Sequence, residues 1–341
     1  MLNQCQIVYH PDNCLNKKRP FAQSCKLCIE ACPHQAIKDN REINAKRCTE
    51  CGVCMAVCPS DGLVDRSIDK LLEYIRGSEQ ITLNCPLANP MGFEISCLGI
   101  LDRDLWLSLL LQSQDKKVEI YTGECVNCPD KKACGLSVQN FNKVHKSWPG
   151  HPPLSVIVAP DNGNNSANDQ QIRKTQSPKM SLRNWSREKL EIMLPGITSD
   201  ESYLIPRSRR FFGETWESKK ALVLPLPALN VSDNCSNCGV CAAICPQKSL
   251  AKKEDKDILT LIYEPFKCVE CQRCVSVCKQ KALSFENKRL SYRMFTGKIR
   301  IHQGKYRYCS RCGKQLFDNV EPPLCYACAT SDSVEGSNFL S

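Results

Sequence analysis

The sequence contains no long apolar run. Its longest apolar-rich stretch, around residues 105–111, is far shorter than the roughly 20 residues that a membrane-spanning helix needs. The first ten residues also lack the basic segment followed by an apolar core that marks a secretory signal. We therefore expect no direct membrane insertion and a cytoplasmic location, with any membrane link made through a partner.

The sequence also lacks the usual marks of an enzyme that acts alone. No glycine-rich dinucleotide fingerprint follows a predicted strand, and no Walker-type phosphate loop is present. The five histidines show no paired spacing, and no nucleophile, base and orienting residue can be grouped from the sequence. We therefore expect a non-catalytic subunit rather than an enzyme with its own substrate pocket.

Cysteine, in contrast, is abundant, with 26 cysteines among 341 residues. Disulfide scaffolds are usually short and secreted, whereas this chain is long and shows no secretory signal. A density of this kind in a long chain is typical of a metal protein. We therefore interpret the cysteines as metal-bound thiolates in a reducing compartment.

The formal net charge of +10 counts every thiol as neutral. A [4Fe–4S] core with four thiolates carries about −2, so four such clusters would lower the net charge to roughly +2. A zinc ion bound by four thiolates would remove about two more charges. We therefore expect no nucleic-acid partner; the basic residues are expected to offset cluster charge and to contact an acidic partner, and Arg207–Arg210 to lie on the solvated surface.

The most regular cysteine pattern lies between residues 235 and 278. It contains two copies of the spacing C-x2-C-x2-C-x3-C, which is typical of a chain that binds two [4Fe–4S] clusters. Three cysteines of one copy bind a cluster together with the last cysteine of the other copy. The first predicted ligand set is Cys235, Cys238, Cys241 and Cys278, and the second is Cys268, Cys271, Cys274 and Cys245. Lys279 stands where proline usually follows the last cysteine, a departure that removes no ligand.

The cysteine pattern between residues 25 and 58 is less regular. By the same interleaving, Cys48, Cys51, Cys54 and Cys32 form one complete ligand set. The other set contains Cys25, Cys28 and Cys58 and lacks a fourth member, because Ala22 occupies the expected position. We predict that Cys14 supplies the fourth ligand. The alternatives are a three-iron cluster, or ligation by a further residue such as Cys5 or His10.

Both cysteine patterns resemble the bacterial two-[4Fe–4S] ferredoxins. This resemblance implies low-potential one-electron transfer and a place between a reductase and the catalytic subunit of an oxidoreductase complex, as in polyferredoxin-type subunits. Four [4Fe–4S] clusters would then be bound. The alternative function is that of an iron–sulfur and zinc protein with a sensing or nucleic-acid-binding role.

The segment between the two patterns, residues 66–160, alternates predicted helices and strands. Helices are expected at 68–75, 101–111 and 136–145, and strands at 81–84, 93–96, 118–121 and 155–159. Asp102 and Asp104 open the second helix, where acidic side chains favour a helix amino terminus. This alternation predicts a small α/β domain with a mainly parallel sheet.

Four cysteines of this middle segment are predicted to form a further metal site. Cys85, Cys97 and Cys125 each follow a predicted strand, and Cys128 comes shortly after, with Cys134 beyond. Ligands of parallel α/β sheets lie outside the carboxyl ends of the strands. The prediction is an additional iron–sulfur cluster, favoured over zinc; the alternative is that Cys85 and Cys97 are buried apolar thiols. The arrangement resembles the cysteine-rich delta subunit of methyl-viologen-reducing hydrogenases.

A last group of cysteines lies near the carboxyl end. Cys309 and Cys312 form one C-x2-C knuckle, and Cys325 and Cys328 form a second. Two such knuckles are typical of a zinc ribbon, so one zinc ion is predicted there. A rubredoxin-like single iron is the alternative, although Ala329 replaces the glycine that usually follows the second knuckle of such sites.

Taken along the chain, these patterns predict a multi-domain α+β protein. Two ferredoxin-like dicluster modules flank the cysteine-rich α/β domain, and a zinc ribbon follows. The predicted boundaries are 1–65 for the first module, 66–160 for the α/β domain, 161–230 for a partly disordered linker, 231–290 for the second module and 300–330 for the zinc ribbon. A small hairpin is expected around residues 37–43, a short helix around 185–194 and a strand at 258–263.

Overall fold

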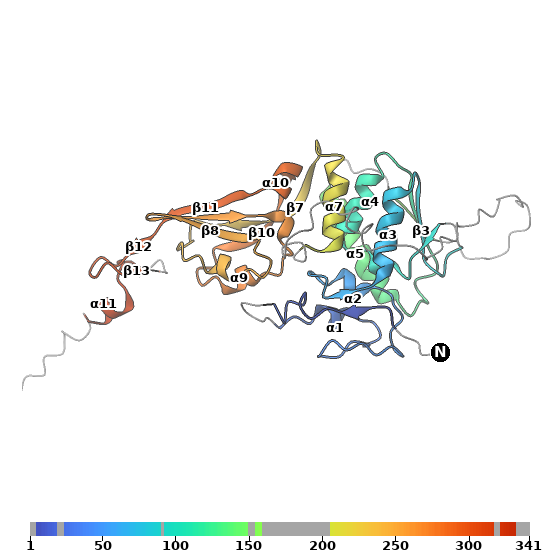
Figure 1. The fold of residues 1–341 in the computed structure, drawn as a ribbon, viewed down its shortest axis with the longest axis horizontal. Helices are drawn as coiled ribbons and strands as arrows, with labels where there is room; N and C mark the ends of the chain where they lie inside the picture. The colour runs from blue at the N-terminus through green and yellow to red at the C-terminus, as the bar shows by residue number, and fades with distance from the viewer. Residues whose placement is uncertain are drawn as a thin grey trace, which may run out of the picture.

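The computed structural model describes residues 5–18, 24–89, 92–148, 154–158, 205–316 and 321–331. We call residues 5–65 the first unit, 66–158 the middle segment, 223–305 the second unit and 306–331 the C-terminal lobe. The first unit and the middle segment lie side by side at one end, the second unit lies next to them, and the C-terminal lobe extends at the other end (Figure 1). Helices and several small sheets are mixed, in agreement with the α+β class. The division into separate domains stays a prediction.

The middle segment is built around a four-stranded parallel sheet, as the sequence predicts. The strands follow the order β4 (Phe93–Glu94), β3 (Ile81–Asn84), β5 (Val118–Thr122) and β6 (Ser155–Val158). Every residue of β3 is buried, because this strand is central and has a partner on each side.

Four helices accompany this sheet. They are α3 (Arg66–Gly77), α4 (Arg103–Gln112), α5 (Lys131–Ser147) and α7 (Arg207–Glu217). Helix α4 is buried along its whole length from Asp104 to Leu111, because it packs against both α5 and α7. Asp102 caps its amino terminus by accepting a hydrogen bond from the Leu105 N–H at 2.8 Å, as the acidic start of this stretch predicts.

The carboxyl-terminal part of the predicted linker, from residue 207 onward, forms regular structure. Residues 161–204, which include the expected helix 185–194, lie outside the described residues, but 207–231 form α7 and strand β7 (Val223–Val231). Among the described strands, β7 pairs only with β10 (Leu283–Ser291). Pro225 and Pro227 are compatible with such an edge strand, because proline has no backbone N–H to donate to a second neighbouring strand. An interpretation of these prolines as linker residues therefore misses the edge strand.

The first unit contains little regular structure. Its elements are β1 (Val8–Tyr9), α1 (Leu27–Ala31), α2 (Val53–Ala56) and β2 (Leu63–Val64), and β1 pairs with β2 in antiparallel fashion. An isolated antiparallel bridge joins Ile37 to Ile43 and confirms the small hairpin. The short 3-10 helix η1 (Leu98–Ile100) of the middle segment contacts both α2 and α5, so the two parts share one packed core.

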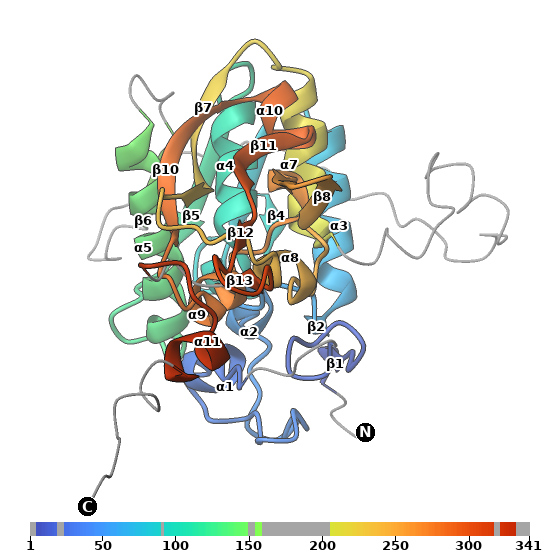
Figure 2. The same cartoon turned by 90° about the vertical axis from the view of Figure 1, so that its left-hand side faces the viewer.

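The second unit carries two small sheets around its cysteine loops. Strand β7 pairs with β10, and a second sheet has the order β11 (Ile299–Lys305), β9 (Ile258–Tyr263), β8 (Leu250–Asp255). The predicted strand 258–263 is thus confirmed. The remaining elements are α8 (Val240–Ala243), η3 (Pro265–Lys267), α9 (Arg273–Val277) and α10 (Tyr292–Thr296). Seen along the long axis, the β7–β10 pair curves in front of α4 of the middle segment (Figure 2).

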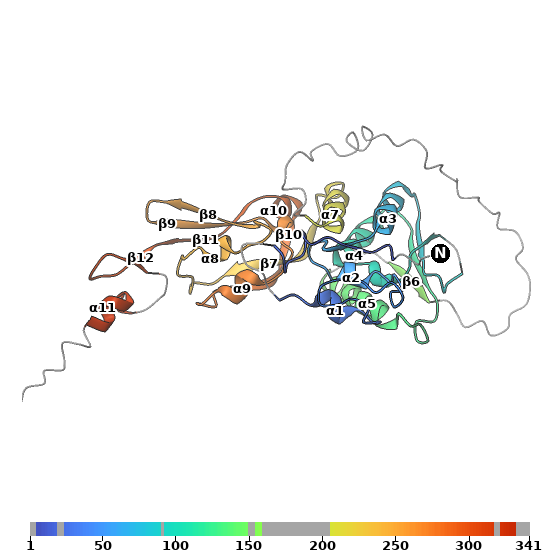
Figure 3. The same cartoon turned by 60° about the horizontal axis from the view of Figure 1, so that its bottom comes forward.

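The C-terminal lobe continues directly from β11. It contains β12 (Arg307–Tyr308), β13 (Gln315–Leu316) and α11 (Tyr326–Ser331), and β12 pairs with β13. Figures 1 and 3 both place this lobe beyond the second unit, away from the first unit. Among the residues described, no helix has the length and apolarity required to traverse a bilayer.

Candidate metal centres

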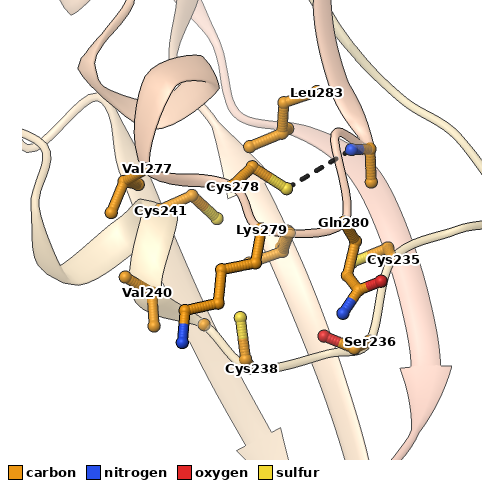
Figure 4. A pocket seen from close by; sticks show the side chains of 13 residues that line it. Cys235, Ser236, Cys238, Val240, Cys241, Val277, Cys278, Lys279, Gln280 and Leu283 are labelled. Atoms are coloured by element: carbon orange, nitrogen blue, oxygen red, sulfur yellow. Dashed lines mark hydrogen bonds between the residues drawn. The ribbon is translucent and has the colours of Figure 1, made fainter. Parts of the chain in front are cut away.

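One cavity of the second unit is lined by the first predicted ligand set. Cys235, Cys238, Cys241 and Cys278 all line a space of about 340 Å³, and Figure 4 shows their side chains around it. Cys235 and Cys238 come from the loop before α8, Cys241 lies within α8, and Cys278 follows the end of α9. The interleaved arrangement that the spacing predicts therefore brings these four side chains to one place.

The second predicted set lies around a smaller cavity of about 20 Å³. Its lining contains Cys245, Cys268, Cys271 and Cys274, with Tyr263 and Arg273 beside them. Tyr263 is almost fully buried, and the Cys268 thiol is a neighbour of its hydroxyl group. Burial raises the pKa of the Cys268 thiol, and the neighbouring Tyr263 hydroxyl, which is buried and has no hydrogen-bond partner among the described residues, opposes that rise.

The three regular cysteine loops share an uncommon backbone. Each has two residues with positive φ, separated by the second cysteine of the loop. They are Glu50, Asn237 and Glu270 on one side, and Gly52, Gly239 and Gln272 on the other, with φ between 54° and 76°. Left-handed residues next to right-handed ones turn successive N–H groups toward one point, which is how backbone concavities hold anionic iron–sulfur groups. The described loop from Cys25 to Cys28 has no residue with positive φ. It is also the loop in which Ala22 stands where the first cysteine of the pattern is expected.

The turns after the last cysteines also repeat. Gln35, Asp61, Lys248 and Lys281, each three residues after such a cysteine, all have φ between 48° and 51°. The next N–H donates to the cysteine sulfur from Ala36 to Cys32 at 3.3 Å, from Gly62 to Cys58 at 3.1 Å and from Ala282 to Cys278 at 3.3 Å. Lys279 therefore leaves the turn unchanged although it replaces proline.

In the first unit, the complete set also surrounds a cavity. Cys32, Cys48, Cys51 and Cys54 line a space of about 20 Å³ together with His34 and Thr49. Burial raises the pKa of the Cys54 thiol, and the neighbouring cysteines raise it further. Burial likewise raises the pKa of Cys51 to about 11.

Cys14 lies beside the incomplete set. A Cβ atom on Gly62 would come within 3.3 Å of the Cys14 Cα and 3.4 Å of the Cys58 Sγ, so these two cysteines flank the same glycine. Burial raises the pKa of Cys28 to about 11, and the charges of Cys58, Cys25 and Cys14 contribute to the rise. Cys14, Cys25, Cys28 and Cys58 are thus electrostatic neighbours, as a shared site requires.

Cys5 is placed elsewhere. Its Sγ donates to the Cys48 Sγ at 3.4 Å, so it lies next to the complete set of the first unit and not next to Cys14. Burial raises its pKa to about 12. This position favours Cys14 over Cys5 for the fourth ligand of the incomplete set, although ligation itself stays a prediction.

The chemistry of these sites fits bound clusters. Buried thiols keep their protons unless a positive charge is close by, and burial raises the pKa of Cys241 to about 12. An iron–sulfur core supplies positive iron to each thiolate, which offsets the burial penalty. Four sets of four converging cysteines therefore fit four [4Fe–4S] clusters.

The middle segment adds Cys134 to the cysteines that the sequence predicts for its metal site. Cys125 and Cys134 have their Sγ atoms 3.5 Å apart, and the pKa of Cys134 is raised first by its hydrogen bond with Cys97. The charges of Cys97 and Cys125 also raise the pKa of Cys128, after burial. Cys85 accepts a hydrogen bond from the Gly123 N–H at 3.3 Å.

Cys134 is therefore a further candidate ligand of the middle site, outside the predicted set of four. It lies in the first turn of α5, six residues after Cys128, and this position brings it close to Cys97 and Cys125. A cysteine near a predicted helix start, close behind a C-x2-C pair, was the signal available in the sequence. Cys85 is buried, and its role as a ligand, or as the apolar thiol of the alternative, stays a prediction.

Asp130 connects the middle site to the first unit. Its carboxylate accepts hydrogen bonds from Thr49 Oγ1 at 2.8 Å and contacts His34 Nε2 at 2.7 Å. Its N–H donates to the Cys128 Sγ at 3.4 Å. His302 Nε2 in turn contacts Asn237 Oδ1 at 2.7 Å. Both histidines thus have structural partners outside the cysteine sets.

The C-terminal lobe has the most compact set of potential ligands. The four sulfurs of Cys309, Cys312, Cys325 and Cys328 all lie within 4.8 Å of one another. Backbone N–H groups, first that of Cys325 and then that of Cys312, lower the pKa of Cys309 to about 6. Among the described residues this is the one group with such close spacing, which suits a single tetrahedral ion.

The two units meet at a polar junction. Lys18 Nζ donates to Gln247 Oε1 at 2.8 Å, and Arg273 Nη2 donates to the Leu15 carbonyl oxygen. Nearby, Arg209 is 5% exposed, and its Nη1 donates to the Cys268 carbonyl oxygen at 2.9 Å. The expected solvated surface at Arg207–Arg210 is therefore wrong for Arg209, because α7 is held between α4 and the second unit.

Two parts of the chain match known protein families. Residues 234–282 match the family described as a 4Fe-4S dicluster domain, and residues 22–69 match the LdpA Fe-S cluster-binding domain. No curated protein matches the chain. The chain therefore contains iron–sulfur cluster-binding domains in both cysteine-rich units. The number of clusters, the zinc ion and the likeness of the middle segment to the hydrogenase delta subunit stay predictions.

Proposed function

We propose that this protein relays single electrons between a reductase and a catalytic oxidoreductase partner in the cytoplasm, as a polyferredoxin-type subunit. The two cluster-binding domains support the iron–sulfur chemistry. Four [4Fe–4S] clusters would be bound by the four converging sets, one zinc ion by the C-terminal lobe, and an additional cluster by Cys97, Cys125, Cys128 and Cys134. When bound, the clusters would supply one-electron transfer. The packing of the chain around the cysteine sets would determine which clusters are neighbours.

The middle site and the first unit share one core. Cys51, Cys97 and Cys134 belong to the same buried cluster of side chains. A Cβ atom on Gly99 would lie 3.0 Å from the Cys51 carbonyl oxygen and 2.9 Å from the Ala133 Cβ, so only glycine allows this approach. The middle site is thus in contact with the Cys51 set rather than separated from it by solvent.

The junction between the two units brings together the set that contains Cys14 and the set that contains Cys271. This contact is the main support for the proposal. Leu15 directly follows Cys14, and Arg273 lies between Cys271 and Cys274. The hydrogen bond from Arg273 to the Leu15 carbonyl therefore joins a residue of each set across the boundary. Burial lowers the pKa of Lys18, while the charges of Cys58 and Cys271, one from each unit, raise it. These contacts support an electron path from one set to the other across the junction.

The test is a redox titration of the anaerobically purified full-length protein. Stepwise reduction with dithionite and reoxidation with thionine should be reversible, with about four electrons per chain for the four [4Fe–4S] clusters and about one more for the additional cluster of the middle site. Far-ultraviolet circular dichroism should stay unchanged, because a relay must cycle without unfolding. Clusters that break down on reduction would contradict the relay. Binding to duplex DNA with a steep salt dependence would instead favour the nucleic-acid-binding alternative.

A further inference from the structure

One predicted cluster site of the second unit opens to the surface. The cavity of Cys235, Cys238, Cys241 and Cys278 has about 340 Å³, and exposed residues lie at its edge. Val240, between Cys238 and Cys241, is 44% exposed and lines the opening. This site also lies in the second unit, beyond the junction with the first unit.

Lysines surround this opening. Lys279 is exposed and lines the cavity, and in Figure 4 its side chain extends across the opening toward Val240. Lys281 is exposed in the same turn, and the Lys252 side chain covers Gly239, with its Cδ 2.9 Å from where a Cβ would stand. We call Lys252, Lys279 and Lys281 the lysine rim.

The charge of the rim is only partly balanced by neighbouring carboxylates. Lys252 Nζ pairs with Glu254 Oε1 at 2.7 Å. In the part of the chain that the structure describes, no carboxylate lines the cavity, and none forms an ion pair with Lys279 or Lys281. Two uncompensated cations beside an exposed valine therefore form a positive surface with an apolar centre.

We infer that the lysine rim is the docking surface for a redox protein whose cofactor lies within an acidic patch. The inference rests on the proposed relay function. Charge complementarity speeds the encounter of such partners and orients them, and the exposed Val240 supplies an apolar contact at the centre. In the docked complex one electron leaves the reduced cluster and reduces the partner's cofactor, with no atom or proton transferred.

Two small haem proteins of opposite charge serve as probes: cytochrome b5, which is acidic, and cytochrome c, which is basic. Each accepts one electron at its ferric haem, which becomes ferrous. The dithionite-reduced full-length protein is mixed with each oxidised probe by stopped flow. The variant carries Lys279→Glu and Lys281→Glu. The matched control carries Lys70→Glu and Lys220→Glu, two exposed lysines on other faces with the same change of net charge.

At low ionic strength, the rim variant should reduce cytochrome b5 about tenfold more slowly than the wild type, and the difference should vanish at high salt. Its reaction with cytochrome c should become faster, and the control should stay within about twofold of the wild type for both probes. Equal rates in the rim and control variants would overturn the inference. Iron content is measured for each variant, so that a rate change caused by cluster loss is recognised. Reversible dithionite titration without probe selectivity would overturn the docking surface and leave the relay function intact.

Discussion

Arg209 Nε donates to Asp104 Oδ2 at 2.5 Å, and both side chains are buried. The pair joins α7 to α4, while the same guanidinium reaches the Cys268 carbonyl of the second unit. It also stands 5.7 Å from the ring centre of Phe295. One side chain therefore ties the middle segment to the cysteine loop of the second unit.

We expect Arg209→Met to destabilise the protein by about 3–5 kcal/mol, because it removes the closer charged partner of the buried Asp104 carboxylate and leaves only Arg103 Nη2, 3.5 Å from Asp104 Oδ1. The control is Arg76→Met, since Arg76 pairs with Glu214 on the surface with more than half of each side chain exposed. That loss should amount to less than about 1 kcal/mol. Anaerobic urea unfolding followed by circular dichroism measures both. Equal losses would contradict the role of Arg209.

Cys14→Ser should remove the cluster of the incomplete set in the first unit or convert it to a three-iron form. The variant and the wild type are compared by their iron and sulfide content and by the EPR spectra of the reduced proteins. Cys5→Ser is the control, because its sulfur lies beside Cys48 and outside the predicted sets. Full iron content and an unchanged spectrum in Cys14→Ser would disprove the assignment.

Tyr263→Phe should lower the reduction potential of the Cys268 set without loss of iron. The Tyr263 hydroxyl is buried beside Cys268 without another hydrogen-bond partner among the described residues, so it is free to donate to a cluster-bound sulfur. Such a hydrogen bond stabilises the more negative reduced state, so its removal favours oxidation. A bond worth about 0.5–1.5 kcal/mol corresponds to a shift of roughly 20–60 mV for one electron. EPR-monitored titration resolves the shift. Tyr292→Phe is the control, since Glu217 is its charged neighbour; the same shift there would count against Tyr263.

Asp102 should make stability depend on pH. Burial, and then the charge of Asp104, raise the pKa of Asp102 from 3.8 to about 7 in the folded protein. Between these values the folded state holds a proton that the unfolded chain has released, so stability falls as the pH rises from about 4 to 7. Asp102→Asn keeps an acceptor for the Leu105 N–H but has no proton to lose.

The unfolding free energy of Asp102→Asn should therefore exceed that of the wild type by an amount that grows from pH 4 to pH 7 and reaches about 1–3 kcal/mol. The control is Asp255→Asn on the exposed end of β8, which should leave the pH profile unchanged. A constant difference between Asp102→Asn and the wild type at all pH values would show that Asp102 does not titrate in this range.

Much of the middle segment could be predicted from local patterns. Short apolar strands such as Ile81–Asn84 and the acidic start of α4 at Asp102 are signals within a few residues, and the structure agrees with them. The edge strand β7 was missed because Pro225 and Pro227 look like linker residues until a single partner strand is known. Arg209 was missed because the burial of a charged side chain depends on helices distant in sequence.

The sequence by itself determined the iron–sulfur chemistry, because cluster ligands follow one another at fixed short spacings that any reader of the chain can count. Only the tertiary structure decided which cysteines meet across long separations. It placed Cys14 beside Cys58, Cys5 beside Cys48, and Cys134 beside Cys125. It also joined the two units through Arg273 and Leu15. These pairings depend on how loops and helix starts pack, and packing between distant segments leaves no periodic trace in the sequence.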